Sequence, residues 1–200
     1  MCHSGGMAGW LTERSRNGGV DEIPLPSSPG RLWLCGKHFI GPDPASALDR
    51  TGATTVVCLN EADELDDRYP DYVTWLRDHA DEGAVWFPIP DLHAPPLDAL
   101  RPVVQDLHRR LAAGEGVVVS CGAGVGRAGT VAACLLVLDG SELSDALEVV
   151  GRHRSTAGPQ TAEQEEFLHH FARTARAERP TGVASPADGE GKGPGRAARS

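Results

Sequence analysis

Short runs of apolar residues alternate along this chain with longer stretches in which apolar residues recur every three or four positions. A short apolar or alternating run is typical of a β-strand, and the longer period is typical of a helix with one buried face. The short runs predict strands at residues 31–35, 54–59, 84–89 and 116–120. The sequence therefore predicts strands separated by helices, which is the pattern of an α/β domain.

The periodic stretches predict helices between and after these strands. The clearest is an amphipathic helix over 97–112, in which apolar residues recur at helical spacing: Leu100, Val103, Val104, Leu107 and Leu111. The other predicted helices cover residues 44–49, 72–79, 127–138 and 142–153, and a last one begins near Thr161 with Phe167, Leu168 and Phe171 facing inward. We expect a central mixed, mostly parallel sheet flanked by helices.

Both ends of the chain lack this periodicity. Residues 1–29 mix Gly, Ser, Pro and isolated charges, and residues 177–200 are largely Pro, Gly, Ala and charged residues. Such compositions bury too little apolar surface to offset the entropy lost on ordering. We therefore expect disordered segments at 1–29 and 177–200 around one domain at 30–176.

Composition and charge exclude several classes of function. No apolar run approaches the roughly 18 residues that span a membrane, and no signal-peptide core is present, so we expect a cytoplasmic protein. A formal net charge of −9 disfavours nonspecific binding to nucleic acid or an anionic membrane. Five scattered cysteines argue against a disulfide framework, and the eight histidines lack metal-ligand spacing. We expect a monomer without a metal or other cofactor.

The segment Cys-Gly-Ala-Gly-Val-Gly-Arg at residues 121–127 carries the most chemical information. It follows a predicted strand and leads into a predicted helix. Such a turn brings backbone N–H groups together, and the helix dipole adds partial positive charge, so an anion site forms. A cysteine there is favoured as a thiolate, and Arg127 offers a planar fork for two phosphate oxygens. The pattern indicates attack on a phosphate ester; the alternative is a buried structural cysteine beside a Gly-rich turn.

Two further segments favour the catalytic interpretation. Val85–Asp91 is predicted as a strand that enters a Pro-rich loop, and Pro159–Gln164 lies downstream of the cysteine. With residues 121–127, they resemble the cysteine-based protein tyrosine phosphatases, most closely the compact dual-specificity branch. In that family the general acid is an Asp on a Pro-containing loop. The nucleophile loop follows, with His-Cys, five residues, Arg, and then Ser or Thr, and a glutamine motif comes after it. The resemblance implies the phosphatase fold.

The resemblance also implies roles for the residues that match. Cys121 would be the nucleophile that forms a cysteinyl-phosphate, and Asp91 would protonate the leaving oxygen and later activate water. An Asp after proline is also an ordinary loop-capping residue. The phosphate would be bound by Arg127 and the loop backbone of Gly122, Ala123, Gly124, Val125 and Gly126.

The glutamine motif has two candidate residues. Gln160 resembles the family glutamine that positions the hydrolytic water. Gln164 has capping-box spacing to Thr161, which explains it without a catalytic role. Both glutamines are secondary candidates.

The chain departs from the family pattern at two positions in the loop. Ser120 replaces the histidine that helps to organise the loop, although its hydroxyl can take over some hydrogen bonds. Ala128 replaces the Ser or Thr whose hydroxyl stabilises the departing thiolate, and Thr130 is the nearest hydroxyl in sequence. These departures leave the first chemical step intact and put hydrolysis of the phosphoenzyme in doubt.

Two other features have competing interpretations. Cys58 could form a protective disulfide with Cys121, as in some relatives, or be a small buried strand residue, which we favour. The acidic run at 61–67 could recognise a basic substrate or form a solvated surface, and we favour the surface.

Together these patterns predict a phosphatase that acts on a phosphorylated protein, at phosphotyrosine and also at phosphoserine or phosphothreonine. One alternative is a phosphoinositide phosphatase, although relatives of that kind often carry lysines in the loop and residues 122–126 contain none. The other is a catalytically weak phosphate-binding pseudophosphatase, which Ser120 and Ala128 motivate.

Overall fold

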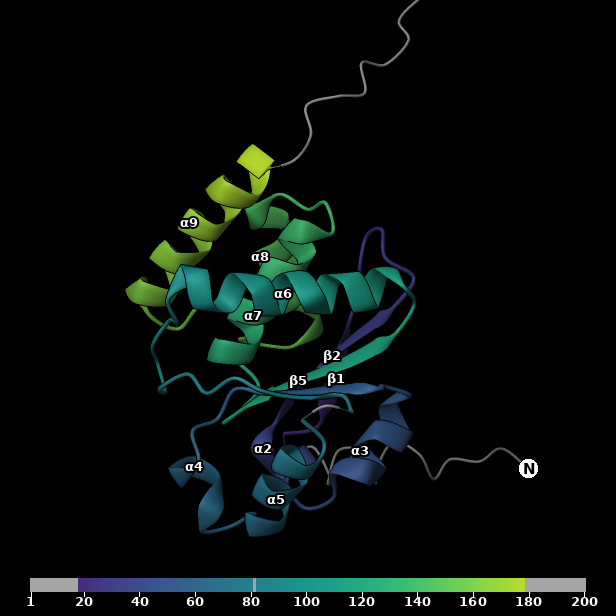
Figure 1. Cartoon of the computed structure of the whole chain (residues 1–200). Helices are drawn as coiled ribbons and strands as arrows, with labels where there is room; N and C mark the ends of the chain where they lie inside the picture. Colours follow the sequence, from purple (N-terminus) through teal and green to yellow (C-terminus); the bar gives the residue numbers. More distant parts are fainter. Residues whose placement is uncertain (1–17, 81, 179–200) are drawn as a thin grey trace, which may run out of the picture.

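A five-stranded mixed sheet forms the centre of the molecule in the computed structural model, which describes residues 18–80 and 82–178 (Figure 1). The strand order is β1-β2-β5-β3-β4. β1 is antiparallel to β2, and all other neighbouring strands are parallel. The strands are β1 (Val20–Ile23), β2 (Arg31–Gly36), β3 (Thr55–Cys58), β4 (Ala84–Trp86) and β5 (Gly116–Cys121). The predicted mixed, mostly parallel sheet is confirmed.

Helices cover both faces of this sheet (Figure 1). The sheet separates two apolar clusters, one under each layer of helices. One face carries α2 (Lys37–Ile40), α3 (Pro44–Thr51), α4 (Asp63–Asp66) and α5 (Pro70–Asp78). The other carries α6 (Leu97–Ala112), α7 (Gly126–Leu138), α8 (Leu143–His153) and α9 (Ala162–Glu178). None of these helices is long and apolar enough to cross a membrane, within the part of the chain that the structure describes.

The central strand β5 and the helix α7 that follows it are deeply buried elements. All six residues of β5 are buried, because β2 and β3 flank the strand and helices cover both faces. α7 packs against α6, α8 and α9, so it is apolar on nearly every side. The turn between β5 and α7 therefore sits on a rigid base at the carboxyl ends of the parallel strands, where open α/β sheets bind ligands.

The structure differs from the predicted segments mainly near the start of the chain. The expectation of disorder over 1–29 is wrong for residues 20–23, which form β1, because Ile23 is buried and the strand pairs with β2. Residues 24–29 are described as well, and the N–H groups of Ser27 and Ser28 donate to the carboxylate of Asp139. The part of that expectation at 1–17, and most of the C-terminal one, at 179–200, lie outside the described residues. α9 continues to Glu178, two residues beyond the predicted end of the domain.

Other boundaries shifted for local reasons. β4 ends at Trp86 and not at residue 89, because Pro88 has no N–H to continue the ladder. The N–H groups of Phe87 and Ile89 still donate to β3 and the residue after it. Two helices of a single turn, α2 and α4, were not predicted because four residues carry no helical period.

Candidate active site

Cys121 ends β5, and residues 122–125 form the loop that leads into α7. The cysteine is 3% exposed, at the base of a cavity of about 410 Å³. Gly124 has φ +72°, and a Cβ there would overlap the carbonyl of Cys35 at the end of β2. Only glycine meets both conditions, so close contact with the neighbouring strand explains a glycine at the centre of the loop.

The carbonyl groups of this loop all accept hydrogen bonds from outside it. The N–H of Lys37 donates to Gly122, and the N–H of Gly158 donates to Val125, both at 3.2 Å. The guanidinium of Arg154 donates to the carbonyls of Ala123 and Gly124, both at 2.7 Å. Because a trans peptide points its N–H opposite to its C=O, the N–H groups of the loop are directed away from these partners. Such an arrangement is a backbone nest, a geometry that suits an anion.

The side chain of Arg154 is itself fixed from β1. It is 4% exposed, and its Nη1 lies 2.6 Å from the carboxylate of Asp21. No local pattern marks this residue, because it follows two other basic residues at the end of α8. The contact couples the first strand of the sheet to the loop beside Cys121.

Arg127 lies in the first turn of α7 and points into the same cavity. Its Nη1 donates to a carboxylate oxygen of Glu64 at 2.6 Å and to the carbonyl of Ile89 at 2.8 Å. Its Nη2 donates to the other oxygen of Glu64 at 2.9 Å and lies 3.0 Å from Asp91. The side chain is 2% exposed, and its Nε has no hydrogen-bond partner among the described residues. One N–H on the cavity-lining side chain is therefore left for a ligand.

Glu64 is a site residue that sequence reasoning missed, because it belongs to the acidic run interpreted as a solvated surface. Burial alone would raise its pKa, but hydrogen bonds from Arg127, the backbone of Glu61 and the side chain of Asn60 lower it to about 2. In turn, the pKa of Arg127 is raised above its usual value: burial lowers it, and the bond to Glu64 and nearby negative charges outweigh that effect. The pair holds the guanidinium plane in one orientation.

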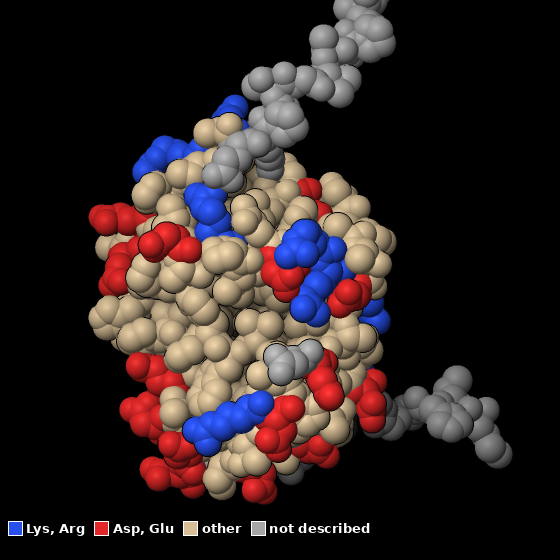
Figure 2. All heavy atoms as spheres, in the orientation of Figure 1, with Lys and Arg blue, Asp and Glu red and all other residues tan. Residues whose placement is uncertain are grey.

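Three of the other four acidic residues of this run are exposed, as the favoured interpretation expected, and Glu61 is half-buried. Asp63, Asp66 and Asp67 lie on the surface around α4. Figure 2 shows carboxylates gathered over the half of the molecule that carries α4 and α5. The interpretation as a solvated surface therefore holds for Asp63, Asp66 and Asp67 and is wrong for Glu64, which binds Arg127.

Asp91 lies on the loop after β4, at the mouth of the cavity. Its side chain is 69% exposed and forms the ion pair with Arg127 described above. The next residue, Leu92, has φ +63° and is 55% exposed, which is unusual for a leucine on both counts. The structure thus brings Asp91, Cys121 and Arg127 to one cavity.

Both glutamines of the downstream motif also line the cavity. The side chain of Gln160 donates to the carbonyl of Thr156 at 3.0 Å. The hydroxyl of Thr161 accepts from the N–H of Gln164 at 3.3 Å, as a capping box requires. The reciprocal half of the box is absent, because Gln164 accepts from the N–H of Gln160 at 2.8 Å and donates to His93 at 3.1 Å. The capping box therefore does not account for Gln164.

Ser120 and Cys58 lie on the opposite face of the sheet from Cys121. Side chains alternate along a strand, so Ser120 points into the cluster under α2–α5, where it donates to the carbonyl of Val57 at 3.2 Å. Cys58 pairs with Ser120 in register and faces the same cluster. A disulfide between Cys58 and Cys121 does not fit this arrangement. Burial raises the pKa of the Cys58 thiol to about 11, as expected for a packed strand residue.

The hydroxyl nearest in sequence to Ala128 is engaged by the backbone of α7. Thr130 donates to the carbonyl of Gly126, one turn back in α7, at 2.9 Å. Ala128 is completely buried in the core under α6–α9. No group of three or more potential metal ligands occurs among the described residues.

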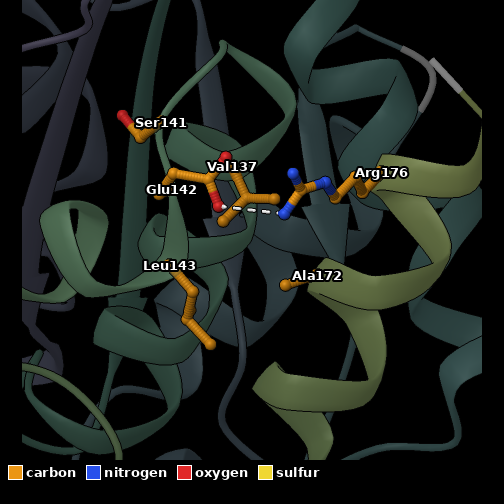
Figure 3. A pocket seen from close by; sticks show the side chains of 6 residues that line it. All are labelled: Val137, Ser141, Glu142, Leu143, Ala172 and Arg176. Atoms are coloured by element: carbon orange, nitrogen blue, oxygen red, sulfur yellow. Dashed lines mark ion pairs between the residues drawn. The ribbon is translucent and has the colours of Figure 1, made fainter. Parts of the chain in front are cut away.

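A second hollow lies at the opposite end of α7, between α8 and α9 (Figure 3). An ion pair of 3.8 Å between Arg176 and Glu142 crosses it. Its lining residues are Val137, Ser141, Glu142, Leu143, Ala172 and Arg176. It contains none of the predicted site residues, so the cavity beside Cys121 is the candidate active site.

Comparison with solved structures shows the same fold. The crystal structure of Tk-PTP in its active form is 25% identical, with a TM-score of 0.58, and covers 76% of this chain and 96% of its own. Kinase associated phosphatase (KAP) is 22% identical, with a TM-score of 0.64, and the match covers 80% and 96% of the two chains. PTPMT1 in complex with PI(5)P is 19% identical, with a TM-score of 0.56, and covers 79% and 97%.

Comparison with protein families gives a more direct assignment. A search of the curated proteins found no match. Residues 31–181 match the family model PTP-SAK, described as Swiss Army Knife protein, DSP-PTPase phosphatase domain. This match covers more than half of the chain and includes the cavity with Cys121, Arg127 and Asp91. The chain belongs to the PTP-SAK family of DSP-PTPase domains, and it is a phosphatase.

Proposed function

We propose that this phosphatase hydrolyses phosphotyrosine in proteins, together with phosphoserine or phosphothreonine, through a cysteinyl-phosphate on Cys121. The buried, unpartnered Nε of Arg127 carries the proposal. A buried donor without a partner costs free energy, and it lies beside a cysteine and a backbone nest that both suit a phosphate. The apolar side chains of Leu92 and Val125 line the same cavity and can contact the ring of a phosphotyrosine.

The phosphate would bind along one edge of the Arg127 guanidinium. Glu64 and backbone carbonyls hold the other N–H groups, which leaves the Nε–H and the Nη2–H that now faces Asp91. Two parallel hydrogen bonds from this edge match two phosphate oxygens. Binding would displace the Asp91 carboxyl from Arg127 towards the leaving oxygen, and the loop N–H groups would bind the remaining oxygens.

In the first step the Cys121 thiolate would attack phosphorus, the bond to the leaving oxygen would break, and Asp91 would give that oxygen its proton. In the second step Asp91 would take a proton from water. The water oxygen would bond to phosphorus, and the S–P bond would break to return the thiolate. Arg127 and the nest would stabilise the negative charge of both transition states without a metal.

Turnover of phosphopeptides by wild type and Cys121→Ser tests this function. Wild type should release phosphate from a phosphotyrosine peptide, and Cys121→Ser should not, although it should still bind vanadate because the nest is made of backbone. Phosphatidylinositol phosphate vesicles serve as a second substrate. Normal turnover by Cys121→Ser overturns the mechanism, faster turnover of the lipid overturns the substrate class, and vanadate binding without any turnover identifies a silent phosphate-binding module.

A further inference from the structure

We propose that the N-terminus of α9 positions the general acid, through a latch formed by Thr161, Glu163 and Gln164. These three side chains bind residues 92–94, which directly follow Asp91. The proposal rests on the proposed role of Asp91 as the acid. It gives the glutamine-motif segment a function in this chain that differs from positioning water.

Three hydrogen bonds join the latch to three consecutive residues of the acid loop. The hydroxyl of Thr161 donates to the carbonyl of Leu92 at 3.0 Å. The amide of Gln164 donates to the carbonyl of His93 at 3.1 Å. The N–H of Ala94 donates to the carboxylate of Glu163 at 3.1 Å. Since the latch both donates and accepts, it fixes the orientation of successive peptide units, which a single contact could not do.

The backbone of the loop needs such support at Leu92. A leucine with φ +63° is in the left-handed region that side chains with a Cβ avoid, and such strain persists only where surrounding contacts hold it. Burial does not hold Leu92, because its side chain is 55% exposed. The bond from Thr161 to its carbonyl supplies a contact at the strained residue itself. Strain next to a catalytic residue is a common way to aim a side chain.

The latch and Arg127 contact different groups of the acid loop: the latch binds the backbone of residues 92–94, and Arg127 pairs with the carboxylate of Asp91. In the structure, Arg127 holds the carboxylate of Asp91 from within the cavity. A bound phosphate takes that N–H of Arg127, and the Asp91 side chain then loses this contact. The three bonds to α9 do not involve the cavity edge of Arg127, so they persist when substrate binds. They would keep Asp91 over the leaving oxygen during proton transfer.

Gln164 is suited to this role by its burial. Gln164 is 1% exposed. Its amide oxygen accepts from the N–H of Gln160, and its amide nitrogen donates to the carbonyl of His93. The amide therefore joins the start of α9 to the acid loop as a fixed bridge. One N–H of the amide and one lone pair of its oxygen are committed to this bridge.

A comparison of Glu163→Ala with Glu165→Ala tests the latch. Both glutamates lie in the first turn of α9 and are exposed, so they interact alike with the helix dipole, but only Glu163 binds the acid loop. Glu163→Ala should lower kcat on a phosphotyrosine peptide by about 3- to 10-fold, the scale of one hydrogen bond. On para-nitrophenyl phosphate, whose leaving group needs less protonation, the loss should be under twofold. Glu165→Ala should resemble wild type on both substrates.

Thr161 gives a second test with its own rescue. Thr161→Val should produce the same selective loss, and Thr161→Ser should restore the rate because it keeps the hydroxyl. Equal losses on both substrates, or no rescue by serine, would show that α9 only supports the fold and would overturn the latch.

Hydrogen exchange separates this proposal from the proposed function. The N–H of Ala94 should exchange at least several-fold faster in Glu163→Ala than in Glu165→Ala, whether or not the protein turns over substrate. If the two variants exchange alike, the latch does not exist. If wild type hydrolyses neither substrate while Ala94 exchange responds to Glu163, the latch holds the loop and the proposed catalysis is wrong.

Discussion

At the scale of single residues, the site depends on how the N–H groups of one guanidinium are shared. Glu64 and the carbonyl of Ile89 occupy the inner N–H groups of Arg127, so the plane of the side chain cannot rotate freely. The Nε–H stays without a partner among the described residues, and in the proposed function it is one of the two donors that bind the phosphate. Lysine could supply the charge at this position but not two parallel donors in a fixed plane.

The absence of a hydroxyl at Ala128 leads to a kinetic prediction. Thr130 is engaged with Gly126 and Ser120 points to the other face, so neither replaces the family hydroxyl in this structure. Breakdown of the phosphoenzyme should then be slower than its formation. Rapid mixing with excess substrate should show a burst of leaving group before a slower steady state.

The variant Ala128→Ser provides the comparison for this burst. One hydrogen bond from a hydroxyl to the departing thiolate contributes roughly 1.5–3 kcal/mol to stabilising that charge. The steady rate should therefore rise about ten- to a hundredfold, and the burst should shrink. Ala132→Ser, in the same helix and also buried, is the control for adding a hydroxyl to the core. A wild type without a burst, and an unchanged rate in Ala128→Ser, would show that another group already performs this step.

At the scale of elements, β1 and the end of α8 stabilise a loop that neither of them adjoins in sequence. Asp21 on β1 holds Arg154, and Arg154 holds two carbonyls of the loop after Cys121. Arg154→Met should therefore weaken vanadate binding by about tenfold or more, because two loop carbonyls lose their buried donor and the loop N–H groups lose their common orientation. Isothermal titration with vanadate measures the change.

Arg152→Met is the matched control for this prediction. Arg152 lies two residues away, is exposed, and pairs with Glu148 within α8, so it should leave vanadate affinity unchanged. Arg154→Lys should recover part of the affinity, since one ammonium can reach one carbonyl but not both. Equal affinities for wild type and Arg154→Met would mean that the loop keeps its shape without the clamp.

Local sequence patterns predicted the elements and the central loop well, and long-range contacts account for what they missed. The spacing of Cys121 and Arg127 is local, so it could be recognised without a structure. Arg154 and Asp21 are 133 positions apart, and no periodicity connects them. Glu64 was hidden because nothing in an acidic run marks which member faces inward.

The prediction for Gln164 failed for a related reason. Its spacing to Thr161 is that of a capping box, but the carbonyl of His93 and the N–H of Gln160 bind its side chain instead. Local spacing describes only the partners within one helix turn. The loop that competes for this amide arrives from another part of the fold.

At the scale of the whole molecule, several carboxylates join separate elements, which makes the fold sensitive to acid. Glu22 binds Arg31 across β1 and β2, and Asp139 at the end of α7 accepts from Ser27 and Ser28 before β2. The pKa of each is lowered: the bond to Arg31 is the main cause for Glu22, and bonds from the two serines and His108 outweigh burial for Asp139. Groups of this kind stabilise the fold above their ordinary pKa and lose that effect as they are protonated.

Glu64 should be a large single contributor to this acid sensitivity. Its pKa is about 2 in the folded protein against an ordinary value of 4.5, so its contribution is fully present above pH 4.5 and disappears as pH falls towards 2. A shift of this size corresponds to at most about 3 kcal/mol in the free energy of unfolding. Urea unfolding of wild type and Glu64→Gln should therefore differ most at pH 7 and progressively less between pH 4.5 and 2. Asp63→Asn, which changes an exposed neighbour in α4, controls for the loss of one negative charge. If the difference between wild type and Glu64→Gln does not depend on pH, the carboxylate of Glu64 does not stabilise the fold through its charge on Arg127.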